Sequence, residues 1–213
     1  HHALNSYLAK LIRAGKTAAL CDQVEDPKTA KGLVRREITR IVTPGTVTED
    51  GLLDETVNNY IASVSGLAVS ILDLSTGEFG VETLKSVEKL DEALERYRPA
   101  ELIVSDEEDF SSRGEIFENA TRIQNWTFSA EAAYDNLTRH FKVLSLDGFG
   151  LDGKGDAVSA AGALIYYVGS TLRHSLAHVR SLRIMDSGDA LVLDNSTIRH
   201  LQLLPYGDSS AYR

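Results

Sequence analysis

Three carboxylates beside two predicted strands could support metal chemistry. Asp73 lies near the end of an apolar run, and Glu101 and Asp106 flank the run 102–104. Two-metal phosphoryl transfer needs several carboxylates that converge on paired divalent cations. Neither Glu101 nor Asp106 lies inside an apolar strand that faces Asp73. Asp73 also precedes a Ser-Thr-Gly turn, where an aspartate commonly binds its own backbone. The sequence therefore favours a turn-capping aspartate, and the alternative is a metal-dependent ribonuclease-H-like nuclease that uses Asp73.

Two histidines have the spacing of a zinc pair but lack its context. His174 and His178 are four residues apart, as two ligands on one helix face would be. The metalloprotease version needs a glutamate directly after the first histidine, and Ser175 stands there. We therefore expect two surface or capping histidines and no metal site. Likewise, we expect the acidic run 106–109 to be a solvated loop and Trp126 to be a core residue.

Two further patterns, one typical of a phosphate-binding loop and one of a nucleophile, lack the neighbouring residues that such sites need. Gly15-Lys16-Thr17 resembles the end of a P-loop, but that motif needs a glycine five positions earlier, where Lys10 stands. We expect Gly15 to end a helix instead. Cys21 lies in an apolar run without a neighbouring histidine, which predicts a small buried strand residue. No catalytic set and no cofactor site follow from the residues.

Composition indicates an ordinary globular protein. The chain has 213 residues, of which 43% are hydrophobic and 25% charged, and it contains one cysteine. A disulfide scaffold and a structural zinc site are therefore excluded. No apolar run approaches the roughly 20 residues of a membrane span, and the N-terminus has no signal-peptide pattern. We expect a cytosolic protein without a membrane partner.

Charge divides the chain into two unequal parts. The whole sequence carries a net charge of −9, yet residues 1–48 contain eight Lys and Arg against four Asp and Glu. Bulk charge does not favour non-specific nucleic-acid binding. The basic first part could still lie near phosphate groups.

The order of predicted elements indicates an α/β fold. Hydrophobic spacing and turn residues predict helices at 4–14, 87–97, 130–141, 156–172 and 197–204, a helical turn at 115–120, a glycine loop at 148–155, and strands at 17–21, 36–43, 60–64, 67–74, 78–84, 102–104, 123–126, 181–185 and 190–193. The polar, acidic residues 49–59 are predicted to link two domains. In the second block, three antiparallel strands precede strand–helix crossovers, which is typical of a ribonuclease-H-like mixed sheet with flanking helices.

Several longer motifs resemble one family. They are Tyr7-Leu8-Ala9-Lys10-Leu11, Cys21-Asp22-Gln23-Val24-Glu25-Asp26-Pro27, Lys31-Gly32, Arg40-Ile41-Val42-Thr43-Pro44-Gly45-Thr46, Leu72-Asp73-Leu74-Ser75-Thr76-Gly77-Glu78-Phe79, Pro99-Ala100-Glu101-Leu102, Gly148-Phe149-Gly150, His178-Val179-Arg180-Ser181-Leu182 and Leu193-Asp194-Asn195-Ser196-Thr197-Ile198-Arg199-His200-Leu201. In this order, along the whole chain, they resemble the MutS family of DNA mismatch repair proteins.

The resemblance implies a domain division and a non-catalytic role. Residues 1–48 would be the C-terminal part of an α+β mismatch-recognition domain I, 49–59 a linker, 60–193 the connector domain II, and 194–213 the start of the core or lever domain III. The connector of this family is ribonuclease-H-like without nuclease activity. The family's Phe-x-Glu mismatch reader does not occur in this sequence, and we expect the chain to begin after it.

The resemblance also implies partners and cofactors. A full-length member is expected to be a bacterial or archaeal homodimeric ATPase that binds ATP and Mg²⁺, recognises mismatched double-stranded DNA and signals to MutL. This stretch is expected to need no cofactor.

Candidate contact residues follow from charge and from helix geometry. The basic residues expected near the DNA backbone are Lys10, Lys28, Lys31, Arg35 and Arg36. On the predicted helix 130–141, Asp135, Asn136 and Arg139 lie off the inward face and are candidates for contact with MutL.

Overall fold

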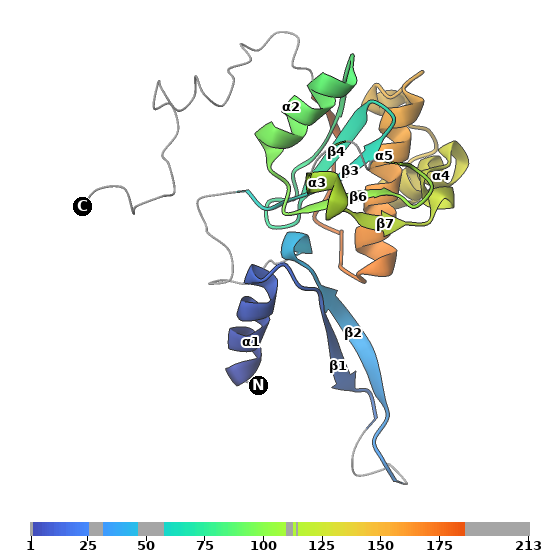
Figure 1. Cartoon of the computed structure of the whole chain (residues 1–213). Coiled ribbons are helices and arrows are strands. Elements are labelled where there is room, and N and C mark those ends of the chain that lie inside the picture. The colour runs from blue at the N-terminus through green and yellow to red at the C-terminus, as the bar shows by residue number, and fades with distance from the viewer. Residues whose placement is uncertain (1, 26–31, 47–57, 110–112, 114, 186–213) are drawn as a thin grey trace, which may run out of the picture.

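The computed structural model describes residues 2–25, 32–46, 58–109, 113 and 115–185. We call the described residues up to 46 the head and those from 58 onward the sheet body. Figure 1 shows the head as one helix and a long hairpin beside the sheet body. Most of the predicted linker 49–59, the predicted strand 190–193 and the predicted helix 197–204 lie outside the described residues.

The head consists of one helix and one hairpin. Helix α1 (His2–Arg13) is followed by Gly15, whose φ of +68° suits the left-handed conformation after a helix. Strands β1 (Ala18–Gln23) and β2 (Arg36–Val42) pair antiparallel, with a register shift after Leu20. A small core joins helix to hairpin through Leu8 and Val42, against which Ile12, Ala18 and Leu20 pack.

The hairpin corrects one expectation. Cys21 is exposed, so the predicted buried strand residue is wrong. Strand β1 alternates half-buried and exposed positions only near α1, and from Cys21 onward every residue of the strand is exposed. The apolar run 17–21 therefore reaches beyond the small core that its first residues share with the helix.

The sheet body contains the predicted mixed sheet, which among the described residues has six strands in the order β7-β6-β3-β4-β5-β8. The strands are β3 (Tyr60–Ser65), β4 (Ala68–Asp73), β5 (Phe79–Thr83), β6 (Glu101–Ser105), β7 (Thr121–Ile123) and β8 (Arg183–Ile184). The first three form an antiparallel meander, while β6 runs parallel to β3, β7 to β6 and β8 to β5. The predicted ribonuclease-H-like element order is confirmed.

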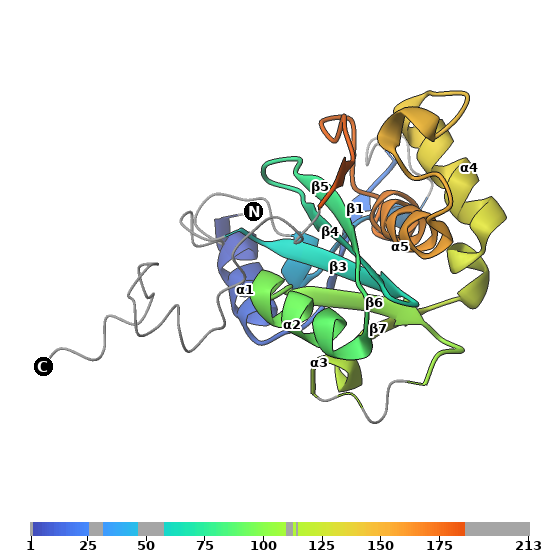
Figure 2. The same cartoon turned by 90° about the horizontal axis from the view of Figure 1, so that it is seen from above.

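Helices cover both faces of this sheet, as Figure 2 shows from above. The α-helices are α2 (Val87–Tyr97), α3 (Glu115–Glu118), α4 (Ala130–Phe141) and α5 (Gly155–Tyr166). Apolar side chains of α2 and α3 pack on one face, and those of α4 and α5 pack on the other. The central strands are therefore buried on both sides.

Short helical turns replace some predicted regular elements. They are η1 (Pro44–Thr46), η2 (Asn125–Phe128), η3 (Asp147–Phe149) and the π-helical η4 (Tyr167–Thr171). The predicted strand 123–126 ends early because Asp106 accepts a hydrogen bond from the backbone of Asn125, which starts η2. The predicted helix 156–172 changes to η4 after Tyr166.

Trp126 lies on η2 and corrects a second expectation. Its side chain is 49% exposed, so the predicted core role is wrong. The indole ring stands edge-on to Tyr166 at 5.1 Å between centroids, and its Nε1 donates to Gln124. Contact with one neighbouring ring leaves about half of this large residue in solvent.

Among the residues described, the longest helices are too short or too polar to cross a bilayer.

Candidate functional site

Asp73 caps the turn between β4 and β5, as predicted. Its Oδ1 accepts hydrogen bonds from the backbone N–H of Ser75 at 2.8 Å, from the Ser75 hydroxyl at 2.6 Å and from the N–H of Thr76 at 3.4 Å. The side chain is buried, and Gly77 closes the turn by donating to the Asp73 carbonyl. This carboxylate is therefore engaged in holding the hairpin turn.

The carboxylates proposed for the nuclease alternative do not converge. In β4, Asp73 alternates with Leu72 and shares the face of Ile71, which packs toward α2. In β6, Glu101 shares the face of Ile103, which packs toward α5. The two acids thus extend from opposite faces of the sheet. Asp106, the third, binds the backbone at the start of η2.

Glu101 has structural partners of its own. Its Oε1 accepts from the Tyr167 hydroxyl at 2.6 Å and from the Thr121 hydroxyl at 3.2 Å. Burial raises the pKa of Tyr167, and the neighbouring Glu101 carboxylate raises it further. The phenol therefore stays protonated and donates to Glu101.

The two histidines bind separate backbone carbonyls. His174 Nε2 donates to the Ile41 carbonyl at 3.0 Å, and His178 Nε2 donates to the Leu74 carbonyl at 2.8 Å. Burial lowers the pKa of His174, and the backbone hydrogen bond opposes part of that shift. Each imidazole therefore ties two chain segments together. His178 is exposed, as predicted for a surface histidine, whereas His174 is half-buried, and neither caps a helix. Within the described part of the chain, no cluster of three His, Cys, Asp or Glu suits a metal ion.

The described basic candidates are distributed over the head. Lys10 is exposed on α1, with Nζ 5.9 Å from the centre of the Tyr7 ring. Arg35 forms an ion pair with Glu37, and its backbone N–H donates to Glu25. Lys28 and Lys31 lie outside the described residues.

Arg36 is placed by the hairpin register. It is exposed opposite Gln23, on the face that Cys21 and Ile38 share. Arg40 pairs with Leu20 on the other face. The structure therefore presents positive charge on both faces of the hairpin, rather than in one compact patch.

Helix α4 presents two of its three candidate residues to solvent. Asp135 and Arg139 are exposed and lie one turn apart, while Ala133 and Leu137 are buried against the sheet body. Asn136 is half-buried, and among the residues described its Nδ2 has no hydrogen-bond partner. A partner that docks on α4 would contact Asp135 and Arg139 more readily than the amide nitrogen of Asn136.

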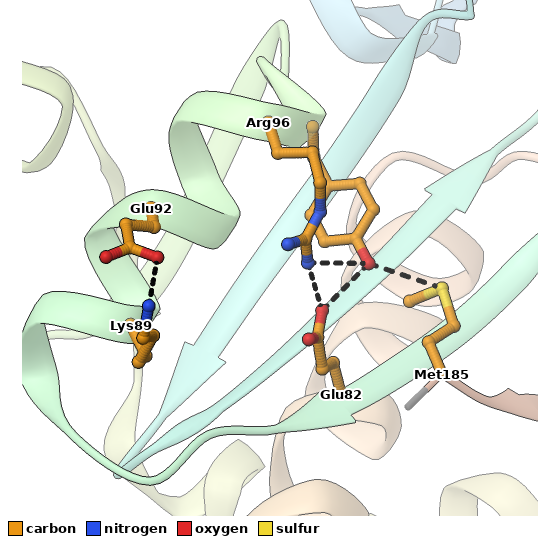
Figure 3. Close-up of polar contacts among 6 residues, drawn as sticks. Glu82, Lys89, Glu92, Arg96 and Met185 are labelled. Carbon is orange, nitrogen blue, oxygen red and sulfur yellow. Dashed lines mark hydrogen bonds and ion pairs between the residues drawn. The ribbon is translucent and has the colours of Figure 1, made fainter. Parts of the chain in front are cut away.

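The sequence did not predict a buried carboxylate on the face of the sheet that α2 covers. Glu82 is 2% exposed at its side chain, and its Oε2 accepts from Arg96 at 2.5 Å and from the Tyr97 hydroxyl at 2.9 Å. Figure 3 shows these groups with Met185, whose sulfur accepts from the Tyr97 hydroxyl at 3.5 Å, beside the surface pair Lys89–Glu92. Burial raises the pKa of Tyr97. The alternation of apolar and polar residues along β5 did not indicate this buried carboxylate, because both faces of the strand are covered.

Comparison with known proteins agrees with this arrangement. The family model described as MutS domain II matches residues 59–180, and that of MutS domain I matches residues 1–51. The chain is 44% identical over 216 aligned positions to the DNA mismatch repair protein MutS of Porphyromonas gingivalis, and 39% identical over 214 positions to that of Parabacteroides distasonis. Each alignment covers 96% of this chain and 24% of the relative, so the chain spans about a quarter of the curated relatives' length.

Proposed function

Because this chain belongs to the MutS family of DNA mismatch repair proteins, we propose that its head approaches the DNA backbone. The sheet body relays conformational changes between domains and contacts partner proteins. The observation that carries this proposal is the match of both family models, in order, to a basic head and an acidic ribonuclease-H-like body. We assign ATP and Mg²⁺ binding and the homodimer contacts to other parts of a full-length member. We assign no bond-breaking step to the described residues.

The contribution of the head to DNA binding is electrostatic. Lysine and arginine side chains that neutralise phosphates release counterions, so affinity falls as salt rises and carries no sequence information. Mismatch reading in this family needs an aromatic wedge and a carboxylate, and wedging of this kind kinks a weakened base step. No Phe-x-Glu motif is present in this sequence. We therefore expect weak binding without mismatch preference.

Filter binding of matched and mismatched duplexes at several salt concentrations tests this role. Replacing Lys10 and Arg36 by glutamine should weaken binding to both duplexes equally and reduce the salt slope by about 0.9 for each phosphate that is no longer neutralised. Arg180→Gln, an exposed arginine of the sheet body, is the matched control and should change neither. A clear preference of the parent chain for mismatched DNA, or an unchanged salt slope in the double variant, would contradict the proposal.

The second part of the proposal concerns MutL. Asp135 and Arg139 on α4 are its contact residues, because they are exposed one helical turn apart on a helix whose other face is buried. Reversing both charges, Asp135→Lys with Arg139→Glu, should abolish MutL recruitment in a pull-down. Glu88→Lys on α2, across the sheet, is the matched control. Undiminished recruitment by the double variant would remove α4 from the contact.

Incubation with DNA and Mg²⁺ tests the non-catalytic assignment. We expect no cleavage, because Asp73 Oδ1 is held by the β4–β5 turn and Glu101 lies on the opposite face of the sheet. Cleavage that disappears in Asp73→Asn would establish the nuclease alternative.

A further inference from the structure

Two side chains of the sheet body bind the backbone of the head directly. Arg173 Nη1 donates to the Ile38 carbonyl at 2.8 Å, and His174 Nε2 donates to the Ile41 carbonyl at 3.0 Å. Both acceptors are in β2, and both donors follow η4. The two bonds join residues 135 and 133 positions apart in the sequence.

The end of η4 places these donors. Arg173 has a φ of +56°, a left-handed conformation that is uncommon for a residue other than glycine. The N–H of His174 returns to the Val168 carbonyl at 3.1 Å and thereby closes the helix end. Leu172 and Leu176 on either side are buried in the core of the sheet body. The donors are therefore carried by a fixed turn rather than by a free loop.

A second contact lies at the base of the hairpin. A Cβ atom on Gly45 would overlap Cγ1 of Ile61 and lie 3.1 Å from Cβ of Glu101, so the turn η1 rests on the ends of β3 and β6 without a side chain between them. Asn59 Nδ2 also donates to the Pro44 carbonyl at 2.9 Å. Glu101 in turn accepts from Tyr167, the first residue of η4.

Both contacts therefore lead from the hairpin to the same π-helical turn. A single contact would allow the hairpin to pivot, whereas two contacts at separate points along β2 and η1 fix its direction. The head's own core is small: among the head's side chains whose burial the structure describes, Leu8 and Val42 form its buried part.

We propose that Arg173 and His174 are positioning residues, which lock the β1–β2 hairpin to the sheet body so that the two move as one unit. The role of this joint in presenting the hairpin to DNA rests on the proposed function. The joint itself does not, because it is made entirely of contacts within the chain.

Distance measurement between two spin labels tests the joint without DNA. In a Cys21→Ser background, cysteines replace Leu33 near the hairpin tip and Leu144 after α4, since both leucines are fully exposed. We expect one narrow distance distribution. Arg173→Gly, which keeps the left-handed backbone, combined with His174→Ala should raise the undocked population by roughly 30-fold, because two hydrogen bonds are removed, and should broaden the distribution.

Two further variants separate positioning from stability. Arg173→Lys with His174→Gln keeps a donor at both positions and should restore the narrow distribution, and Arg180→Ala in the same segment should leave it unchanged. A distribution that is broad in the parent, or narrow in the Arg173→Gly/His174→Ala variant, would overturn the proposal. Filter binding of the same variants distinguishes the two ideas: a locked hairpin that binds no DNA refutes the proposed function and leaves the joint standing.

Discussion

Replacing Gly162 by alanine should destabilise the sheet body although alanine is the better helix former. Gly162 lies in α5 where that helix crosses α4. A Cβ atom there would overlap Cα of Ala133 and lie 2.5 Å from its carbonyl oxygen. Because the obstructing atoms belong to the backbone of α4, no side-chain rotation relieves the overlap.

The expected loss of stability in Gly162→Ala follows from two opposing effects. Non-bonded heavy atoms are optimal at about 3.5–4.0 Å, so the helices would have to separate by about 1 Å. Overpacking of this kind costs about 3 kcal/mol at a rigid site, while alanine in place of glycine returns about 1 kcal/mol of helix propensity. The expected net loss is about 2 kcal/mol, which for a chain of this size corresponds to a fall of about 4–8 °C in Tm.

Urea unfolding followed by far-UV circular dichroism, with Trp126 fluorescence as a second probe, measures this loss. Gly155→Ala is the matched control because it makes the same chemical change in the first turn of α5, where nothing lies within 4 Å of the added Cβ. The control should be neutral or about 1 kcal/mol more stable. If Gly162→Ala behaves like the control, α4 and α5 do not pack as closely as described and the reasoning fails.

Three further outcomes follow from the geometry. Gly45→Ala, whose Cβ would overlap Ile61, should destabilise by about 1–3 kcal/mol and accelerate amide exchange in β2, measured by mass spectrometry. Arg96→Met should cost about 3 kcal/mol in urea unfolding, because the buried Glu82 carboxylate would keep the Tyr97 hydroxyl but lose its positively charged partner, and adding Glu82→Gln should restore most of that loss. Burial raises the folded pKa of Tyr60 to about 12 from an unfolded value near 10, so its contribution to stability is present below pH 10 and is lost between about pH 10 and 12; Tyr60→Phe should flatten that alkaline decline in unfolding experiments.

Local signals predicted the elements whose ends are set by neighbouring residues. Helix α2 begins and ends as predicted because the Ser86 hydroxyl caps its first turn and Pro99 prevents its continuation. The turn-capping role of Asp73 was predictable for the same reason, since its partners lie two and three residues away. The order of strands followed from these boundaries, and it was sufficient to indicate the fold class.

The wrong expectations concerned burial, which depends on elements that lie far away in the sequence. Trp126 and Cys21 have residue types that favour burial, yet the neighbouring elements leave them exposed. Glu82 has a type that favours solvent, yet α2 closes over it and supplies Arg96 and Tyr97. Hydrophobic periodicity describes one strand at a time, and it does not show whether a helix covers the other face of the sheet.

The contacts between head and sheet body also join residues that lie far apart in the sequence. They bear on how a movement of the head would reach the rest of the protein. A two-stranded hairpin is marginal by itself in water, and the head adds only a small core around Leu8 and Val42. The hairpin is therefore held in direction largely by Arg173 and His174, which follow η4, and by the Gly45 turn, which rests on β3 and β6. A force that displaces the hairpin must either break these bonds or move the end of α5, and α5 packs directly on α4, where Asp135 and Arg139 are exposed. A continuous path of packed residues thus runs from the hairpin of the head to the proposed partner surface, and it requires no flexible element in between.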